Sequence, residues 1–280
     1  MKAAAFEYHR ATQAPEAMKF IADYAGAAKF IAGSQSLGPM LNLRLARPSH
    51  LIDISQCADL RDVELRNGVI RVGAAITHAE IEDGIYEPLQ GHPLQQVAGR
   101  IAYRSVRNRG TIGGSIAHAD PAADWVLASM AFNASIEILS AHNIRKVPMQ
   151  QFMLAAYTTV LKDDEIISAI EFPVFSSQSR WGYYKFCRKT GEFAEASCAV
   201  LFDPLTRTAR VVVGALDGAP AQLPEIAGHI AREGHGALSL TDIIDALALV
   251  MPNKDLIDRR QYASAVWRSL ELALGPVESI

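Results

Sequence analysis

The stretch Thr111–Asp124, with the sequence TIGGSIAHADPAAD, carries more information about this protein than any other segment. Its adjacent glycines, Gly113 and Gly114, can leave consecutive backbone N–H groups free to bind one anion. Hydroxyl donors flank the glycines, and two arginines just upstream could supply positive charge, Arg107 and Arg109. The sequence therefore predicts an anion-binding loop over residues 110–115.

The second half of this stretch predicts the start of a helix. Asp120 is followed by Pro121, and an Asp cap with Pro at the first helical position is a favoured arrangement. Capping is then the expected main role of Asp120. The alternative is that Asp120 and Asp124 accept hydrogen bonds from sugar or ribityl hydroxyls.

A second small-residue loop lies near the N-terminus, in the sequence IAGSQSL of residues 31–37. It follows a short apolar run over 28–32, which predicts a buried strand, and precedes a predicted helix over 40–45. Small residues let backbone N–H groups approach an anion, and a helix N-terminus adds partial positive charge. The segment matches neither a Walker loop nor GxGxxG, so an ordinary turn is the alternative. Together the two loops favour one extended ligand, a dinucleotide, held from two subdomains.

The remaining pattern mixes strands and helices. Apolar residues at helical spacing predict helices over 15–24, 77–83 and 94–106, and β-branched segments predict strands over 51–54, 68–74, 135–139 and 164–172. After a polar, Ser-rich segment at 173–180, three predicted strands (181–188, 196–202, 209–216) precede three predicted helices (225–232, 240–250, 258–273). The predicted fold class is α+β, with a domain boundary in that polar segment.

Composition narrows the function classes. The 280 residues carry a formal charge of −3 and are 50 % hydrophobic, which excludes a disordered chain. Lys and Arg (27) do not exceed Asp and Glu (30), so no nucleic-acid partner is expected. No apolar run approaches the roughly 18 residues of a membrane span, and the N-terminal segment predicts no signal peptide. The three cysteines form no CxxC pair, so we expect a cytoplasmic protein without a metal centre of its own.

The chain resembles the flavin-binding medium subunit of the molybdenum hydroxylases, the family of carbon monoxide, xanthine and aldehyde or N-heterocycle dehydrogenases. Four stretches carry the resemblance: AGSQSLGP at 32–39, RNRG running into 111–124, DEIISAIEFP at 164–173, and YKFCRK at 184–189 with 194–199. The second stretch is highly specific to this family. The resemblance covers nearly the whole length of the chain.

The resemblance implies a fold and a domain division. Residues 1–174 are expected to form a two-subdomain FAD-binding module of the vanillyl-alcohol oxidase or PCMH type, with subdomains of about 1–55 and 56–174. Residues 175–280 are expected to form a C-terminal domain with a three-stranded antiparallel sheet and helices.

The resemblance also implies a set of FAD-binding residues. Carried over by position, the two loops hold the diphosphate, Asp124 lies on the ribityl or ribose side, Lys185 lies near the isoalloxazine ring, and Ile167 lines the adenine or ring pocket. The expected cofactor-binding residues are Ala32, Gly33, Ser34, Gln35, Ser36, Leu37, Thr111, Ile112, Gly113, Gly114, Ser115, His118, Asp120, Asp124, Ile167 and Lys185.

Two positions depart from the family pattern, since Ser34 replaces a frequent Gly and Ser115 a frequent Asn. Ser34 can still present its N–H if the backbone there needs no positive φ. Ser115 loses at most a side-chain hydrogen bond, worth roughly 0.5–1.5 kcal/mol. His118 is a conceivable point of covalent flavin attachment, but the family binds FAD without a covalent bond.

The implied function is that of a redox relay subunit. Electrons pass from [2Fe–2S] clusters of a small subunit to FAD in this chain and then to a quinone, NAD or O₂. A large subunit with the molybdopterin cofactor oxidises an aldehyde, an N-heterocycle, a purine-like substrate or CO. A dimer of such heterotrimers, a heterohexamer, is expected, and no side chain of this chain is a predicted catalytic group. The alternatives are a non-redox nucleotide-binding or scaffold subunit and a free-standing FAD oxidoreductase.

Overall fold

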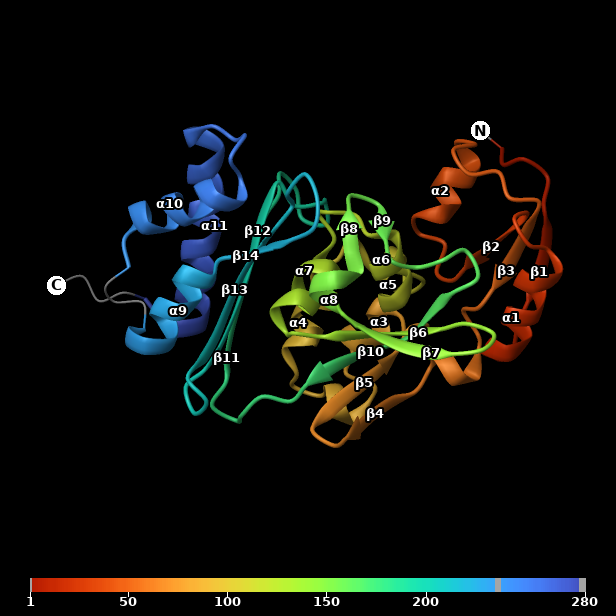
Figure 1. Cartoon of the computed structure of the whole chain (residues 1–280), viewed down its shortest axis with the longest axis horizontal. Helices are drawn as coiled ribbons and strands as arrows, with labels where there is room; N and C mark the ends of the chain where they lie inside the picture. Colours follow the sequence, from red (N-terminus) through yellow and green to blue (C-terminus); the bar gives the residue numbers. More distant parts are fainter. Residues whose placement is uncertain (1, 235–237, 277–280) are drawn as a thin grey trace.

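The computed structural model describes residues 2–234 and 238–276 and arranges them in three parts along the long axis of the molecule (Figure 1). An N-terminal part, a central part and a C-terminal part each contain their own sheet, and a two-stranded sheet adds to the central part. Helices and strands are mixed throughout, so the α+β class predicted from the sequence is confirmed. No helix in the described ranges is long and apolar enough to cross a membrane.

The N-terminal part is a three-stranded parallel sheet in the order β1-β3-β2, with β1 at the outer edge. A buried face of helix α1, formed by Ala14, Ala17, Met18 and Ile21, packs on it. Its elements are β1 (Glu7–Arg10), α1 (Ala14–Asp23), β2 (Ala28–Ile31), α2 (Leu37–Asn42) and β3 (His50–Asp53). The predicted helix 40–45 therefore begins three residues earlier and ends at Asn42.

The central part is a five-stranded antiparallel sheet in the order β4-β5-β10-β6-β7. Its strands are β4 (Val63–Arg66), β5 (Val69–Gly73), β6 (Ser135–Leu139), β7 (Ile144–Pro148) and β10 (Ile166–Pro173). Asn67 and Gly68 both have positive φ, at 52° and 74°, which is the backbone of a two-residue hairpin turn. The turn predicted there is confirmed, and it joins β5 to a strand that the sequence pattern did not reveal.

Short helices cover one side of the central sheet. They are η1 (Ala58–Leu60), α3 (His78–Glu82), η2 (Glu87–Leu89), α4 (Pro93–Gly99), α5 (Arg104–Arg107), α6 (Ile112–His118), α7 (Asp124–Ala131) and α8 (Met149–Phe152), with the small strands β8 (Met153–Ala155) and β9 (Thr158–Thr159). The predicted single helix 94–106 is wrong. It is two helices, because the chain turns at Ala102, where φ is +41°.

The C-terminal part is an antiparallel sheet with helices on one face. It comprises β11 (Arg180–Phe186), β12 (Ala196–Asp203), β13 (Thr208–Gly214), β14 (Ala221–Gln222), α9 (Pro224–Glu233), α10 (Leu240–Val250) and α11 (Leu256–Leu274). The three predicted strands are present, and the two-residue β14 adds a fourth at the edge. Gly182 lets α11 approach closely, because a Cβ there would lie 1.9 Å from the carbonyl oxygen of Ser269.

Helix α7 joins the central and C-terminal parts. Every residue of α7 is buried, because the helix is enclosed between the central core and the sheet face formed by β12 and β13. Successive β12 residues alternate between two cores: Ala199 and Leu201 face α7, whereas Cys198 and Val200 face helices α9–α11. Burial on both faces explains why this strand is a continuous run of small and apolar residues.

Candidate functional site

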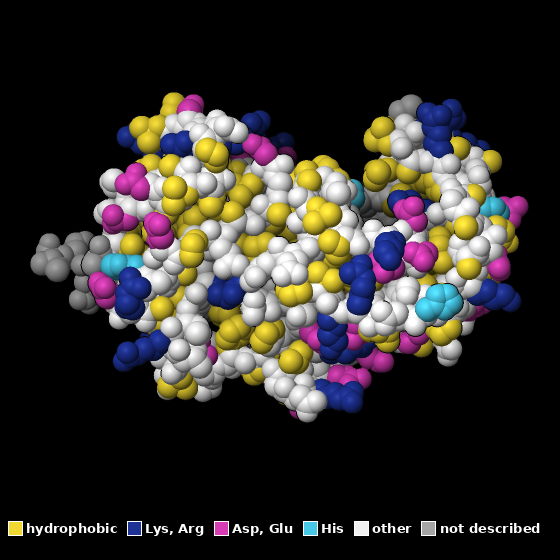
Figure 2. Space-filling model, viewed as in Figure 1, with side chains coloured by type: hydrophobic (Ala, Val, Ile, Leu, Met, Phe, Trp, Pro, Cys, Tyr) yellow, Lys and Arg dark blue, Asp and Glu magenta, His cyan; other side chains and the backbone are white. Residues whose placement is uncertain are grey.

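A cavity of about 790 Å³ opens between the N-terminal and central parts. This volume is in the range of sites that enclose a large organic ligand. Both small-residue loops line the cavity, together with β9 and residues from the β11–β12 connection. Figure 2 shows the surface hollowed beside the N-terminal part, which stands at the right of the view.

The first loop leaves an array of backbone donors at the cavity wall. Among the described residues, no group accepts a hydrogen bond from the backbone N–H groups of residues 33–37. Gln35 holds the loop in shape, because its Nε2 donates to the carbonyl oxygen of Gly33 at 2.9 Å. The N-terminal end of α2 follows directly. Free N–H groups at the start of a helix can bind an anion. The structure thus places unpaired donors where the sequence predicted an anion-binding loop.

Ser34 has a φ of +62°, in the left-handed region. The condition that the backbone at Ser34 needs no positive φ is therefore not met. Serine adopts this conformation at a cost that glycine avoids. The strain lies inside the donor array.

The two loops touch. A Cβ at Gly33 would lie only 2.0 Å from the carbonyl oxygen of Arg109, so no other residue fits without a backbone shift. A Cβ at Gly114 would lie 4.0 Å from the Cβ of Ala32. One cavity wall is therefore made jointly by the N-terminal and central parts.

The second segment is a helix, and the prediction of an open amide loop there is wrong. Residues 112–118 form α6, and Thr111 caps it by accepting a hydrogen bond from the N–H of Gly114 at 3.1 Å. The N–H groups of Ile112 and Gly113 donate to Ile76 and Ala74 beyond β5, at 3.0 and 2.9 Å. The amides that the double glycine was expected to free are thus already paired. The hydroxyl of Ser115 makes no hydrogen bond among the described residues and lines the cavity.

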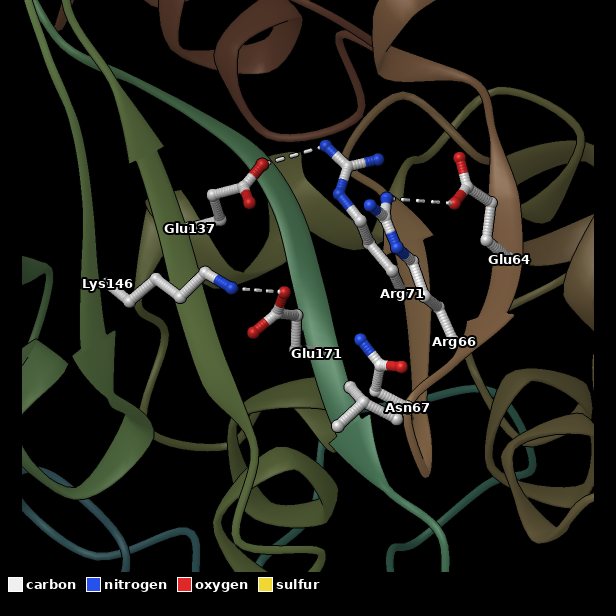
Figure 3. A pocket seen from close by; sticks show the side chains of 8 residues that line it. Glu64, Arg66, Asn67, Arg71, Glu137, Lys146 and Glu171 are labelled. Carbon is white, nitrogen blue, oxygen red and sulfur yellow. Dashed lines mark hydrogen bonds and ion pairs between the residues drawn. The ribbon is translucent and has the colours of Figure 1, made fainter.

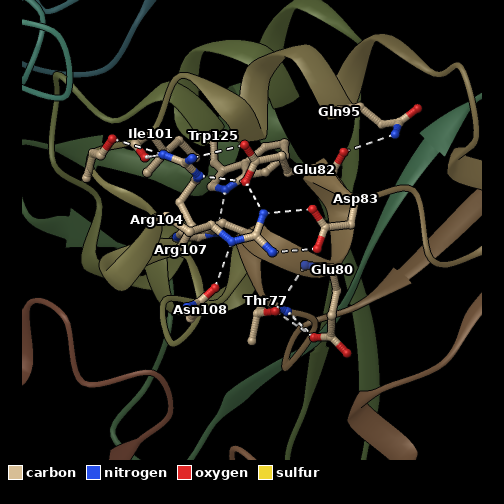
Figure 4. Close-up of polar contacts among 12 residues, drawn as sticks. Thr77, Glu80, Glu82, Asp83, Gln95, Ile101, Arg104, Arg107, Asn108 and Trp125 are labelled. Carbon is tan, nitrogen blue, oxygen red and sulfur yellow. Dashed lines mark hydrogen bonds and ion pairs between the residues drawn. The ribbon is translucent and has the colours of Figure 1, made fainter.

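The upstream arginines do not supply charge to the cavity. The guanidinium of Arg107 binds both carboxylate oxygens of Glu82, at 2.7 and 3.0 Å, and the carbonyl oxygens of Ile101 and Ala102 (Figure 4). Arg109 is exposed and does not line the cavity. The arginine network instead fixes α5 to α3 and so positions the segment that precedes α6. The lysines in the lining are Lys29, Lys162 and Lys185.

Asp124 and Lys185 form a buried ion pair at the cavity wall. The Nζ of Lys185, on β11, lies 3.0 Å from Oδ2 of Asp124, the first residue of α7, and both side chains are about 5 % exposed. The hydroxyl of Tyr183 donates to the same carboxylate. Burial raises the pKa of Asp124 above its ordinary value, and the ammonium of Lys185 opposes that rise. Because α7 and β11 both contribute, the C-terminal part also shapes the site.

His78 also lines the cavity, although no sequence pattern points to it. It is buried, and its Nδ1 accepts a hydrogen bond from the indole N–H of Trp125 at 2.9 Å. Burial lowers the pKa of His78 to about 3, with a smaller contribution from Arg107, so the ring is neutral at pH 7. With Nδ1 accepting, the proton of the neutral ring is on Nε2. In the sequence, His78 is only the first residue of a short capped helix, and nothing in that pattern predicts a buried neutral ring at the cavity.

Asp120 does not cap a helix as predicted. Its Oδ1 accepts from the N–H of Ala122 at 2.9 Å in a turn, and α7 begins later, at Asp124. Its Oδ2 accepts from the hydroxyl of Tyr157, whose ring packs on His118 with centroids 5.2 Å apart. Asp120, Tyr157 and His118 all line the cavity.

The structure brings every predicted site residue to the cavity except Ile112. The side chain of Ile112 is fully buried in the central core, on the side of α6 away from the cavity. Ile167, on β10, does line the cavity. The larger apolar residues of the lining that were not predicted include Phe30, Ile31, Met40, Ile54, Ile101, Val106, Leu161, Ile166 and Phe193.

A second depression, on the open face of the central sheet, is a different kind of surface. Its charged side chains pair across an intervening strand, Arg71 on β5 with Glu137 on β6 at 2.7 Å and Lys146 on β7 with Glu171 on β10 at 2.6 Å (Figure 3). Cross-strand pairs of this kind stabilise a sheet face that is open to solvent. With three basic and three acidic residues in its lining, this depression selects no charged ligand.

Comparison with known proteins gives consistent results. Residues 4–175 match the family model described as the FAD binding domain in molybdopterin dehydrogenase. The carbon monoxide dehydrogenase medium chain of Hydrogenophaga pseudoflava is 37% identical over 196 residues, 70% of this chain and 68% of that protein. The nicotine 6-hydroxylase medium subunit of Paenarthrobacter nicotinovorans is 36% identical over 202 residues, 70% of each chain.

Solved structures agree over nearly the full length. Carbon monoxide dehydrogenase from Hydrogenophaga pseudoflava superposes with a TM-score of 0.88 at 30% identity, covering 98% of both chains. Quinoline 2-oxidoreductase from Pseudomonas putida 86 gives a TM-score of 0.85 at 27% identity and the same coverage. The chain therefore belongs to the family of FAD-binding medium subunits of the molybdenum hydroxylases.

Proposed function

We propose that this chain is the FAD-containing electron-transfer subunit of a molybdenum hydroxylase. In this function it takes electrons from [2Fe–2S] clusters of a small subunit and delivers them to an external acceptor. A large molybdenum-cofactor subunit oxidises the substrate. The single observation that carries the proposal is the cavity, which has free N–H donors at one end and a buried ion pair elsewhere in its wall, in a chain of this family.

The residues present fit an FAD molecule. A diphosphate needs several donors at close range, and the unpaired N–H groups of residues 33–37, with the hydroxyl of Ser115, supply them. Isoalloxazine and adenine need apolar walls, which Ile54, Ile101 and Ile167 help to supply. When bound, FAD supplies the redox chemistry, and the chain supplies binding, orientation and the surrounding charge.

The proposed roles follow the position of each residue in the cavity. Residues 32–37 and the hydroxyl of Ser115 hold the diphosphate, whereas residues 111–114 shape the wall through the packing of α6, Ile112 from inside the core. Asp124 and His118 lie on the ribityl or ribose side, and Asp120 accepts from sugar hydroxyls. Lys185 lies near the isoalloxazine ring, where an ammonium group favours added negative charge on the flavin. No side chain is required as a nucleophile or acid catalyst.

We propose the domain division that the sequence suggested. Residues 1–174 form the FAD-binding module of the vanillyl-alcohol oxidase or PCMH type, in two subdomains of about 1–55 and 56–174. Residues 175–280 form the C-terminal flavoprotein domain. The separate sheets of the three parts support this division, and the position of the cavity between the first two supports FAD binding across both subdomains.

Partners are proposed from the relatives and from the surface. The relatives are named as medium chains or subunits, so we propose a small [2Fe–2S] subunit, a large molybdenum subunit and a dimer of such heterotrimers. Exposed aromatic side chains gather beside the cavity, at Tyr103, Tyr157 and Phe193. Exposed apolar groups at a redox cavity are suited to cover by a permanent partner.

The experiment compares two glutamate variants of the whole chain. Ala32→Glu places a carboxylate beside the donor array, between the two loops, and Ala22→Glu places the same group on the exposed side of α1. We expect the unaltered chain and Ala22→Glu to retain one FAD each after purification with added FAD, and Ala32→Glu to lose it. Circular dichroism checks that Ala32→Glu is folded.

Two outcomes would contradict the proposal. Absence of FAD from the unaltered, folded chain would favour the nucleotide-binding or scaffold alternative, with which the strain at Ser34 is consistent. Equal FAD retention in both variants would show that the donor array of residues 33–37 does not hold the diphosphate.

A further inference from the structure

Three metal-ligating side chains meet at the outer edge of the N-terminal sheet. The parallel pairing of β1 with β3 places Glu7 opposite His50, and His9 follows on the same face of β1 two residues later. None of the three lines the cavity. The sequence did not predict a metal site in this chain, because the ligands come from strands that are far apart in sequence.

The donor atoms are spaced as ligands of one small ion. Nε2 of His9 lies 3.1 Å from Nδ1 of His50. Oε2 of Glu7 lies 4.0 Å from the His9 nitrogen and 3.6 Å from the His50 nitrogen. Bonds of about 2.0–2.1 Å at tetrahedral angles separate two ligand atoms by about 3.3 Å. The two nitrogens are within a few tenths of an ångström of this value. The carboxylate must move by less than 1 Å.

The two rings are held in place and the carboxylate is free to adjust. His50 stacks on Tyr24 of the α1 C-cap, with centroids 3.9 Å apart and an interplanar angle of 11°, and His9 packs against both Tyr24 and Phe20. The histidine side chains are 18% and 17% exposed, whereas Glu7 is 73% exposed. Preorganised imidazoles lose little freedom on binding, and the exposed side leaves a position for water.

We propose that Glu7, His9 and His50 bind one divalent ion of the zinc class, with water as the fourth ligand. Two imidazole nitrogens and one carboxylate suit zinc, whereas magnesium and calcium prefer oxygen ligands alone. In the His9–His50 hydrogen bond one ring donates its proton to the other. When the ion binds, that proton moves to the other nitrogen of its own ring, so both facing nitrogens bind the ion as neutral imidazoles. Binding ties the edge strand β1 to β3 and so stabilises the N-terminal sheet.

The test is a calorimetric titration of the chelator-treated full chain, without a histidine tag, with zinc chloride. We expect one zinc per chain and a rise in unfolding temperature on zinc addition. His50→Phe keeps a ring on Tyr24 but removes the ligand, and we expect at least tenfold weaker binding. Glu7→Gln changes an exposed side chain, so the variant should fold normally, and we expect a smaller loss of zinc affinity than in His50→Phe.

The controls separate this site from others. His142→Ala removes an exposed histidine outside the cluster, so zinc affinity should not change, and magnesium chloride should give no binding heat. Zinc binding below one per chain in the unaltered protein would overturn the proposal. Zinc affinity that is unchanged in both His50→Phe and Glu7→Gln would place the ion elsewhere and overturn it too. FAD retention plays no part in these readouts, so this proposal and the proposed function fail independently.

Discussion

Replacing Asp124 with Asn tests how strongly the buried ion pair supports the cavity wall. Asp124→Asn keeps the shape of the side chain but leaves the ammonium of Lys185 buried beside a neutral amide. The other hydrogen-bond acceptor of the Lys185 ammonium is the carbonyl oxygen of Arg100, which lies 3.4 Å away, at the limit of a hydrogen bond. Removal of one member of a buried pair costs about 3–5 kcal/mol, and we expect that loss in the free energy of unfolding.

The converse variant, Lys185→Met, should behave differently with pH. It removes the ammonium that opposes the burial-induced rise in the pKa of Asp124, so the carboxyl is then protonated more readily in the folded state than in the unfolded state. A group whose pKa is raised by folding favours the folded state at low pH and loses that contribution as pH rises through the folded pKa. Lys185→Met should therefore lose more stability at pH 8 than at pH 5, whereas Asp124→Asn has no carboxyl to protonate at this position.

The assay is urea unfolding of the flavin-free chain followed by circular dichroism from pH 5 to pH 8. The matched control is the cross-strand pair Lys146 and Glu171, where the lysine is 53% exposed. Lys146→Met or Glu171→Gln should cost at most about 1 kcal/mol, since exposed pairs contribute little. A loss for Asp124→Asn no larger than the loss in this control would refute the reasoning, as would equal pH slopes for Lys185→Met and the unaltered chain.

Three further predictions concern single residues. Ser34→Gly should stabilise the chain by about 0.5–1 kcal/mol, because relief of left-handed strain exceeds the entropy cost of Gly, and the midpoint of urea unfolding measures it. Gly33→Ala should destabilise by about 3 kcal/mol or more because its Cβ overlaps a backbone carbonyl, whereas Gly218→Ala, with nothing within 4 Å, should be nearly neutral. Because folding lowers the pKa of His78 from 6.5 to about 3, its contribution to stability is lost as pH falls below 6.5, by roughly 3 kcal/mol between pH 7 and pH 4. His78→Gln, which can still accept from the indole, should remove that part of the pH slope in the same assay.

Sequence patterns located the cavity but misjudged part of its construction. Small side chains and nearby helix starts in residues 32–37 and 111–124 predict a ligand site, and both segments do line one cavity. The double glycine at 113–114 predicts an open loop, but the structure has a helix there. Glycine is needed at position 113 because α6 packs closely there: a Cβ at Gly113 would lie 2.4 Å from the Cβ of Ala74. Glycine needed for close packing and glycine needed for free amides are identical in a sequence.

The features that could not be predicted depend on contacts distant in sequence. His78 gains its role from the indole of Trp125, and the Glu7, His9 and His50 cluster exists only because β1 pairs in parallel with β3. The same holds for the ion pair between α7 and β11. The local sequence pattern predicts which residues form helices and strands. It does not predict which strands pair or where helices pack, and these contacts bring the side chains together.

The most direct test of the central claim is the composition of the assembly that contains this chain. The chain, tagged and purified from its own cells, should co-elute with FAD, molybdenum and iron–sulfur iron in fixed proportion. Added substrate of the complex should bleach the flavin absorbance, and the Ala32→Glu assembly should keep its iron and molybdenum but lose both the flavin and electron delivery to the acceptor. A lone chain that turns over by itself, or an assembly with iron and molybdenum but no flavin, would contradict the account.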